Sequence, residues 1–339
     1  MPWMSIRWAA VKVTVEIMNL RLWLTGLRPK TLPASIAPVL VGAALAVRRI
    51  EQLGTCIEIY PVPAACLERR ALQADLTNRF WPVAVLCVIV ALFLQIAVNY
   101  ANDYSDGIRG TDEGRDTDEA SAIANKPQRL VASGVPAKYV LAAAVIAAAI
   151  ACAAGVAAIL IAQGWWLFAV GAASLIAGWF YTGGKHPYGY AGFGEVGVFL
   201  FFGLAAVLGT EYALTGSVDA LGVCGAVCCG LNAAMLLMVN NLRDIAEDQQ
   251  HGKYTLAVRL GERRAVMLFI ACLVAAWLLG LYVCVTLWMP WGGILPFAGI
   301  VVSVRLLLSI YRHQFRAALG AAGCQTLLFA IAVGVAAVL

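Results

Sequence analysis

Two acidic segments of this chain combine residue types and spacings that suit metal chemistry. They read NYANDYSDGIRGTD at residues 99–112 and NNLRDIAED at residues 240–248, and each closes a long apolar run. If the preceding helices continue into them, side chains three and four residues apart share one helical face. Polar and acidic groups at the end of a membrane span are costly, so they indicate a functional site. The residues concerned are Asn99, Asn102, Asp103 and Asp106 in the first segment and Asp244 and Asp248 in the second.

Carboxylates gathered in this way predict Mg²⁺ together with a phosphate-bearing ligand. Neighbouring carboxylates repel one another and need a cation, and hard oxygen ligands favour Mg²⁺ over Zn²⁺ or Cu²⁺. Mg²⁺ usually takes one or two carboxylates and completes its shell with substrate phosphates. Basic residues lie within or after these segments, and Lys126, Arg129, Arg243 and Lys253 then describe a diphosphate site. The simpler alternative, that each Asp caps a helix or pairs with an Arg on a wet loop, explains one cluster better than two.

The elements that must position these residues are membrane-spanning helices. The 339-residue chain is 62% hydrophobic and only 13% charged, with a mean hydropathy of +0.82. A soluble domain carries about 25% charged residues, and about 20 apolar residues span a bilayer as a helix. We therefore expect an all-α integral membrane protein whose nine spans form a single bundle with a central cavity open to the inner face. The expected spans are 32–48, 80–101, 139–161, 164–182, 194–213, 219–239, 265–286, 291–310 and 317–339.

The distribution of Lys and Arg predicts the orientation of this bundle. With the N-terminus inside, 19 of the 24 Lys and Arg residues fall on inner segments, as the positive-inside rule requires. The net charge of +5 therefore indicates orientation and contact with membrane lipids, and it does not indicate nucleic acid. We expect an interfacial segment at 1–31, a long outer loop at 49–79 and two catalytic inner loops at 102–138 and 241–264. In the outer loop, Cys56 and Cys66 either form a disulfide or remain thiols.

A diphosphate site at the inner surface of an apolar bundle suggests an isoprenoid substrate. The lipid tail would lie among the helices while Mg²⁺ and basic side chains stabilise the departing diphosphate. The allylic cation left behind is of the kind that aromatic faces stabilise. A secondary transporter is the alternative from another class, since transporters also carry intramembrane acids. The acids here lie at the inner ends of two spans with basic loops behind them, which favours a phosphate-bearing substrate.

Four stretches of the sequence resemble the UbiA superfamily of intramembrane aromatic prenyltransferases, and within it the branch of menaquinone synthesis that acts on 1,4-dihydroxy-2-naphthoate. They are LRPKTLPASIAPVLVG (27–42), NYANDYSDGIRGTD, YTGGKHPYGYAGFGEVGVFLFFG (181–203) and NNLRDIAEDQQHGKYTLAVRLG (240–261). The resemblance implies transfer of a polyprenyl group from a polyprenyl diphosphate to the naphthoate, with loss of its carboxylate, to give demethylmenaquinone. It also implies a bacterial plasma-membrane enzyme whose active site faces the cytoplasm. Related acceptors such as 4-hydroxybenzoate or homogentisate are the alternative within the superfamily.

The resemblance also implies roles for individual residues. Asp103, Asp106, Asp244 and Asp248 would hold Mg²⁺, with two ions bridging the diphosphate, and Lys185 of the Tyr-x-x-x-Lys motif would lie beside it. Further substrate contacts are expected from Asn102, Asp112, Lys126, Arg129, Tyr181, Asn241, Arg243 and Lys253. Asp112 stands two residues beyond the usual position of the last Asp of its motif, and Glu195 is either a structural cap or an acceptor-site carboxylate. The sequence leaves both roles open.

Overall fold

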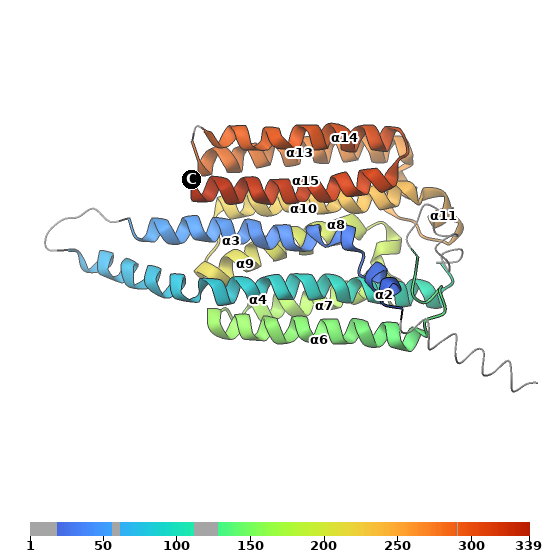
Figure 1. Cartoon of the computed structure of the whole chain (residues 1–339), viewed down its shortest axis with the longest axis horizontal. Coiled ribbons are helices and arrows are strands. Elements are labelled where there is room, and N and C mark those ends of the chain that lie inside the picture. The colour runs from blue at the N-terminus through green and yellow to red at the C-terminus, as the bar shows by residue number, and fades with distance from the viewer. Residues whose placement is uncertain (1–18, 56–61, 112–127, 290) are drawn as a thin grey trace, which may run out of the picture.

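The protein is a bundle of long helices running roughly parallel to one axis (Figure 1). The structure, a computed structural model, describes residues 19–55, 62–111, 128–289 and 291–339. The long helices are α3 (Pro33–Leu53), α4 (Ala64–Ile108), α6 (Ala137–Ala162), α7 (Leu167–Thr182), α9 (Ala206–Thr215), α10 (Ala220–Arg243), α13 (Glu262–Leu287), α14 (Ile300–Tyr311) and α15 (Phe315–Val338). Short α-helices are α2 (Leu20–Gly26), α8 (Gly194–Val198), α11 (Ile245–Gln250) and α12 (Leu256–Leu260). Pro29–Thr31, Tyr188–Ala191 and Trp291–Gly299 form 3-10 helices, and Phe199–Ala205 forms a π-helix.

The prediction of an all-helical membrane bundle is confirmed. Within the described residues, eight helical segments are long and apolar enough to cross a membrane, and α7, with 16 residues, is a shorter apolar helix in the place of the fourth expected span. Two of the eight join adjacent elements, at Gly194–Thr215 and Trp291–Tyr311. Described residues form helices, turns and irregular segments without β-strand. The apolar runs form helices because each then satisfies its backbone hydrogen bonds internally, as lipid requires.

The structure differs from the expected outer loop at 49–79, most of which is helical. Helix α4 has 45 residues, or about 68 Å at the helical rise, which is more than twice the roughly 30 Å of a bilayer core. Its first turns pair with the end of α3 as a hairpin that projects from one end of the bundle (Figure 1). Leu76, Phe80 and Ile50 are buried together in this hairpin. Cys66 is disulfide-bonded, and Cys56 lies outside the described residues.

Glycine allows a very close approach of two segments in the middle of the bundle. A Cβ atom on Gly203 would lie 2.5 Å from the Cα of Gly230 on α10 and 2.7 Å from the carbonyl oxygen of Ala226. Both neighbours are backbone atoms, which cannot rotate away as a side chain can. Small residues at such contacts are how membrane helices pack closely. This contact holds the Gly194–Thr215 segment, and with it one side of the site, against α10.

We expect Gly203→Ala to destabilise the protein by about 1–3 kcal/mol, the usual cost of overpacking a well-filled interior. The measurement is the midpoint of thermal unfolding in detergent. Gly320→Ala on α15 is the matched control, because a Cβ there would meet no atom within 4 Å. Alanine is a better helix former than glycine, so the control midpoint should stay the same or rise. Equal effects of the two substitutions would contradict the close contact.

Candidate functional site

A buried polar cluster attaches the segment before α3 to helix α4. The Asn99 side-chain nitrogen donates to the carbonyl oxygen of Leu27 at 2.8 Å, and Gln95 donates to the Asn99 side-chain oxygen at 2.9 Å. Gln95 also reaches the Thr31 hydroxyl at 3.4 Å. Arg28 adopts a left-handed conformation with φ of 53°, and its carbonyl oxygen accepts from the Thr31 hydroxyl at 2.9 Å. These contacts place Arg28 beside the acidic end of α4.

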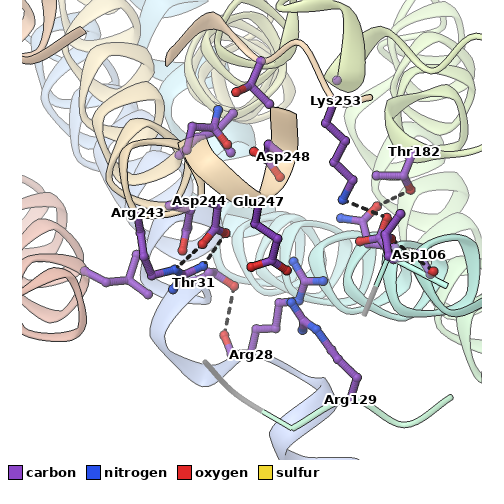
Figure 2. A pocket seen from close by; sticks show the side chains of 18 of the residues that line it. Arg28, Thr31, Asp106, Arg129, Thr182, Arg243, Asp244, Glu247, Asp248 and Lys253 are labelled. Atoms are coloured by element: carbon purple, nitrogen blue, oxygen red, sulfur yellow. Dashed lines mark hydrogen bonds and ion pairs between the residues drawn. The ribbon is translucent and has the colours of Figure 1, made fainter. Parts of the chain in front are cut away.

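Asp106 connects the two inner loops, because it contacts Lys253 of the second loop. The predicted continuation of the helix through the first acidic segment is confirmed, since α4 ends at Ile108. The Tyr190 hydroxyl donates to Asp106, and the Lys253 amine lies 3.4 Å from the same carboxylate oxygen (Figure 2). The Lys253 amine also lies 4.6 Å from the centre of the Tyr190 ring. Burial, together with the charge of Asp106, raises the pKa of Tyr190, so the phenol stays protonated and donates.

Asp103 has a different environment from Asp106, although both lie on the last turns of α4. Its side chain is 0% exposed and accepts from the backbone N–H groups of Leu130 at 3.1 Å and Val131 at 3.2 Å. It does not line the polar cavity described below. Its carboxylate instead holds the start of the segment after residue 127, where the neighbouring Arg129 is buried and does line the cavity. In this arrangement Asp103 supports a basic residue of the site.

The second acidic segment lies across the cavity from these residues. Helix α10 ends at Arg243, and Asp244 occupies the break before α11 with φ of −99° and ψ of 7°. The Arg243 guanidinium makes a two-point contact with Asp244, at 2.7 and 2.8 Å. The backbone N–H of Asp248 donates to the Asp244 carbonyl oxygen at 2.8 Å, so the chain keeps a helical turn across the break. Figure 2 shows Asp244, Glu247 and Asp248 together, with Arg28 and Arg129 facing Glu247.

These side chains line a polar cavity of about 660 Å³. Seven basic residues and four carboxylates face it, which leaves an excess of positive charge. The basic residues are Arg21, Arg28, Lys30, Arg129, Arg243, Lys253 and Arg316, and the carboxylates are Asp106, Asp244, Glu247 and Asp248. Among the residues that the structure describes, no three Asp, Glu, His or Cys side chains come together as a metal site. The carboxylates that line the cavity are of the kind that Mg²⁺ takes one or two at a time, together with phosphate oxygens.

A second cavity, of about 510 Å³ and mostly apolar lining, adjoins the first. The two share Arg28, Thr31, Asn102, Tyr181, Leu237 and Asn240. Along α4 the apolar cavity extends from Asn102 to Cys87, about 22 Å at a rise of 1.5 Å per residue. At its polar end, the Asn102 side-chain oxygen accepts from the Thr182 hydroxyl at 2.7 Å. The arrangement suits an amphiphile with an anionic head and a long apolar tail.

The structure brings most of the predicted site residues together. Nine line the polar cavity, namely Asn102, Asp106, Arg129, Tyr181, Asn241, Arg243, Asp244, Asp248 and Lys253. Asp112 and Lys126 lie outside the described residues. Lys185 is exposed and lines neither cavity.

Among the cavity residues that the sequence analysis did not nominate are Arg28, Tyr190 and Glu247. Arg28 has a visible signal in the LRPKT stretch just before the first span, and Glu247 stands between two nominated Asp residues. Tyr190 stands in the quoted stretch 181–203, but only the fold brings it to Asp106.

We expect Lys185→Ala to change kcat and the donor KM by less than about threefold, because an exposed lysine outside the cavity loses little on truncation. The measurement is the initial rate at a saturating concentration of the expected aromatic acceptor, with the concentration of the expected prenyl diphosphate donor varied. A hundredfold loss would show that Lys185 reaches the cavity once the donor binds. Thermal unfolding of the variant, compared with the wild type, separates such a loss from misfolding.

The protein is therefore a polytopic helical membrane protein in which a cavity lined by many basic side chains adjoins a long apolar cavity. Residues 62–338 match the UbiA prenyltransferase family, and the chain belongs to that family. The resemblance noted in the sequence is thereby confirmed.

Relatives and solved structures agree with this membership. The chain is 43% identical over 254 residues to the 1,4-dihydroxy-2-naphthoate octaprenyltransferase of Mycobacterium leprae, covering 75% of this chain and 74% of that protein. It is 34% identical to the protein of the same name from Escherichia coli, covering 80% and 77%. A UbiA homolog from Aeropyrum pernix shares the fold with a TM-score of 0.60 at 16% identity, covering 89% of this chain and 97% of that one. A homolog from Archaeoglobus fulgidus, solved with GPP and Mg²⁺, gives a TM-score of 0.55 at 16% identity, covering 92% and 98%.

Proposed function

We propose that this protein transfers a polyprenyl group from a polyprenyl diphosphate to 1,4-dihydroxy-2-naphthoate, with loss of the ring carboxylate, to give the hydroquinone form of demethylmenaquinone. The observation that carries the proposal is the junction of a cavity lined by many basic side chains with an apolar cavity. Relatives of the chain are named 1,4-dihydroxy-2-naphthoate octaprenyltransferase, which supports the choice of acceptor. The head of the donor would occupy the first cavity and its tail the second. The acceptor would meet the donor where the two cavities adjoin.

The residues of the polar cavity fit a diphosphate held with Mg²⁺. Asp106, Asp244 and Asp248 offer carboxylate oxygens from two sides, and the hard-oxygen donor set suits Mg²⁺ completed by phosphate oxygens. We assign these three residues to two Mg²⁺ ions, which would supply charge neutralisation for the departing diphosphate. Arg129 from the first inner loop (102–138) and Lys253 from the second (241–264) offset the remaining negative charge. In this proposal Asp103 positions Arg129, because both of its carboxylate oxygens already accept from backbone amides.

The junction of the cavities protects and stabilises the reacting carbon. Tyr181 and Tyr188 pack edge to face with their ring centres 5.6 Å apart, and both line the apolar cavity. Ring faces attract a developing cation, and apolar walls keep out the water that would quench it. The acceptor ring then attacks the allylic carbon, whose bond to the diphosphate has broken, through the ring carbon that bears the carboxylate, and loss of CO₂ from that carbon restores aromaticity. No residue needs to act as a covalent nucleophile.

The orientation that we propose places the polar cavity at the cytoplasmic face of a bacterial plasma membrane. Helices α2 and α11 lie at one end of the bundle, and the α3–α4 hairpin projects from the other (Figure 1). Because Lys and Arg residues are concentrated on the expected inner segments, the end of the bundle that carries α2 and α11 is assigned to the inside. The disulfide at Cys66, in the hairpin, supports the same orientation, because disulfides persist on the oxidising side of a membrane.

The test is a product assay on purified protein in detergent. Geranylgeranyl diphosphate is supplied with either 1,4-dihydroxy-2-naphthoate or 4-hydroxybenzoate, in Mg²⁺ or in EDTA, and products are weighed by mass spectrometry. We expect a product equal to the naphthoate plus the prenyl group minus CO₂, formed only with Mg²⁺. Product from 4-hydroxybenzoate alone would reassign the acceptor while keeping the donor site. Folded protein without product from either acceptor would overturn the proposal and favour a transport function.

A further inference from the structure

Glu195 is a buried acid that the chemistry above does not use. Glu195 lies in the first turn of α8, is only 6% exposed, and lines neither cavity. The Asn241 side-chain nitrogen donates to its Oε1 at 2.8 Å. Its Oε2 is buried without a hydrogen-bond partner among the described residues. Leaving a buried acceptor unpaired is unfavourable, so an acid kept at this position calls for a reason beyond packing.

The surroundings of Glu195 place it behind the junction of the two cavities. A Cβ on Gly197 would lie 2.7 Å from the Tyr188 ring, and one on Gly194 would lie 3.4 Å from the Tyr181 ring. The two glycines therefore let the tyrosine pair pack directly against the turn that carries Glu195. Tyr181 lines both cavities, and Asn241 lines the polar one. The hydrogen bond from Asn241 to Glu195 thus connects the wall of the site to the layer behind it.

The chemistry of this hydrogen bond determines what Asn241 presents to the cavity. The Asn241 side-chain nitrogen is the donor of this hydrogen bond, so the NH₂ group of the amide faces Glu195. The carbonyl oxygen of the same amide then faces away from Glu195. We propose that Glu195 is a positioning residue that directs the Asn241 carbonyl oxygen into the polar cavity, where this oxygen accepts a hydrogen bond from a phenolic hydroxyl of the aromatic acceptor. The proposal rests on the proposed function, since it needs an acceptor with a hydroxyl group.

A hydroxyl is a better match for this oxygen than the donor head. A diphosphate presents acceptor oxygens and negative charge, which a carbonyl oxygen repels. A phenol presents a donor on a flat ring, and the Tyr181–Tyr188 pair beside Asn241 offers aromatic surface to such a ring. Because Glu195 lines neither cavity, it acts through Asn241 and does not touch the reacting atoms.

The first test is Glu195→Gln, measured with the naphthoate acceptor and saturating donor. A glutamine offers both an oxygen and an NH₂ group, so Asn241 is no longer held in one orientation. We expect the acceptor KM to rise about tenfold, the effect of one misdirected hydrogen bond. The donor KM and the Mg²⁺ concentration at half-maximal rate should change by less than about twofold. Glu262→Gln, an exposed glutamate at the start of α13, is the matched control.

A reciprocal exchange separates this role from a merely structural one. In the double variant Glu195→Gln with Asn241→Asp, the new amide donates to the new carboxylate, and the second carboxylate oxygen faces the cavity as an acceptor. We expect the acceptor KM to return to within about threefold of the wild type. If Glu195→Gln does not fold, Glu195→Leu with Asn241→Leu removes both partners at similar volume, and its acceptor KM should rise by the same factor.

Acceptor analogues identify the hydroxyl. The inhibition constants of 1-hydroxy-2-naphthoate and 4-hydroxy-2-naphthoate are compared in the wild type and in Glu195→Gln, and one analogue should lose affinity in the variant while the other does not. An unchanged acceptor KM in folded Glu195→Gln would overturn the proposal. So would a raised Mg²⁺ requirement at constant acceptor KM, which would assign Asn241 to the metal. A wild-type protein without product overturns the proposed function itself, and this inference with it.

Discussion

Asp106→Asn is expected to lower kcat about a thousandfold, the largest single effect that the site predicts. Asp106 joins the two inner loops, since the amine of Lys253, from the second loop, lies 3.4 Å from its carboxylate. The substitution keeps the size of the side chain and an oxygen for the Tyr190 hydroxyl. It removes the charge that helps to hold Mg²⁺ and leaves Lys253 opposite a neutral amide. Lewis-acid stabilisation of a leaving group is worth several kcal/mol, or about three decades in rate.

The measurement is single-turnover product formation at saturating donor, acceptor and Mg²⁺. Asp75→Asn is a matched control on the same helix, because Asp75 is 68% exposed and pairs only across the surface with Arg79 at 3.4 Å. We expect its rate to stay within about twofold of the wild type, as for most surface ion pairs. Retention of a tenth or more of the activity by Asp106→Asn would show that this carboxylate does not hold the metal. Thermal unfolding of both variants verifies that they are folded.

Gly209→Phe is expected to reduce kcat/KM at least about a hundredfold for octaprenyl diphosphate while leaving geranyl diphosphate within about threefold. Gly209 lines the deep end of the apolar cavity, far from the polar end at Asn102. A Cβ there would have one neighbour, a Leu167 methyl group at 4.0 Å, so a larger side chain extends into free volume. A long tail that cannot seat fully displaces the reacting carbon, and a misplacement of about 1 Å can cost a hundredfold.

The two donors distinguish a blocked cavity from general damage. A short prenyl chain ends before it reaches Gly209, so its transfer tests the intact head site in the same variant. Gly334→Phe on α15 is the control, because Gly334 lines neither cavity and a Cβ there meets no atom within 4 Å. Equal loss with both donors would contradict the assignment of the apolar cavity to the tail. An unchanged rate with octaprenyl diphosphate would place the tail elsewhere among the helices.

Hydropathy and charge were sufficient to predict the class of the fold from the residues alone. Long apolar runs have one favourable state in lipid, which is the helix, so the spans follow from hydropathy alone. Helical periodicity also places Asn102 and Asp106 on one face, because their spacing of four is close to one turn. Most of the described part of the expected outer loop at 49–79 is helical, because an apolar position such as Leu76 is buried against Ile50 of α3. Its many charged residues conceal that pattern in the sequence.

Which of the candidate residues share one cavity could not be predicted without the folded structure. Lys253 reaches Asp106 across 147 positions of the chain, and no local pattern encodes such a contact. Asp103 and Asp106 look equivalent in the motif, yet one accepts from the backbone amides of Leu130 and Val131 while the other faces the cavity. Lys185 illustrates the converse, since its motif suggests a site residue and its side chain is exposed. Helical spacing sets the direction of a side chain on its own helix, whereas the partner on the other side depends on how distant loops close over the bundle.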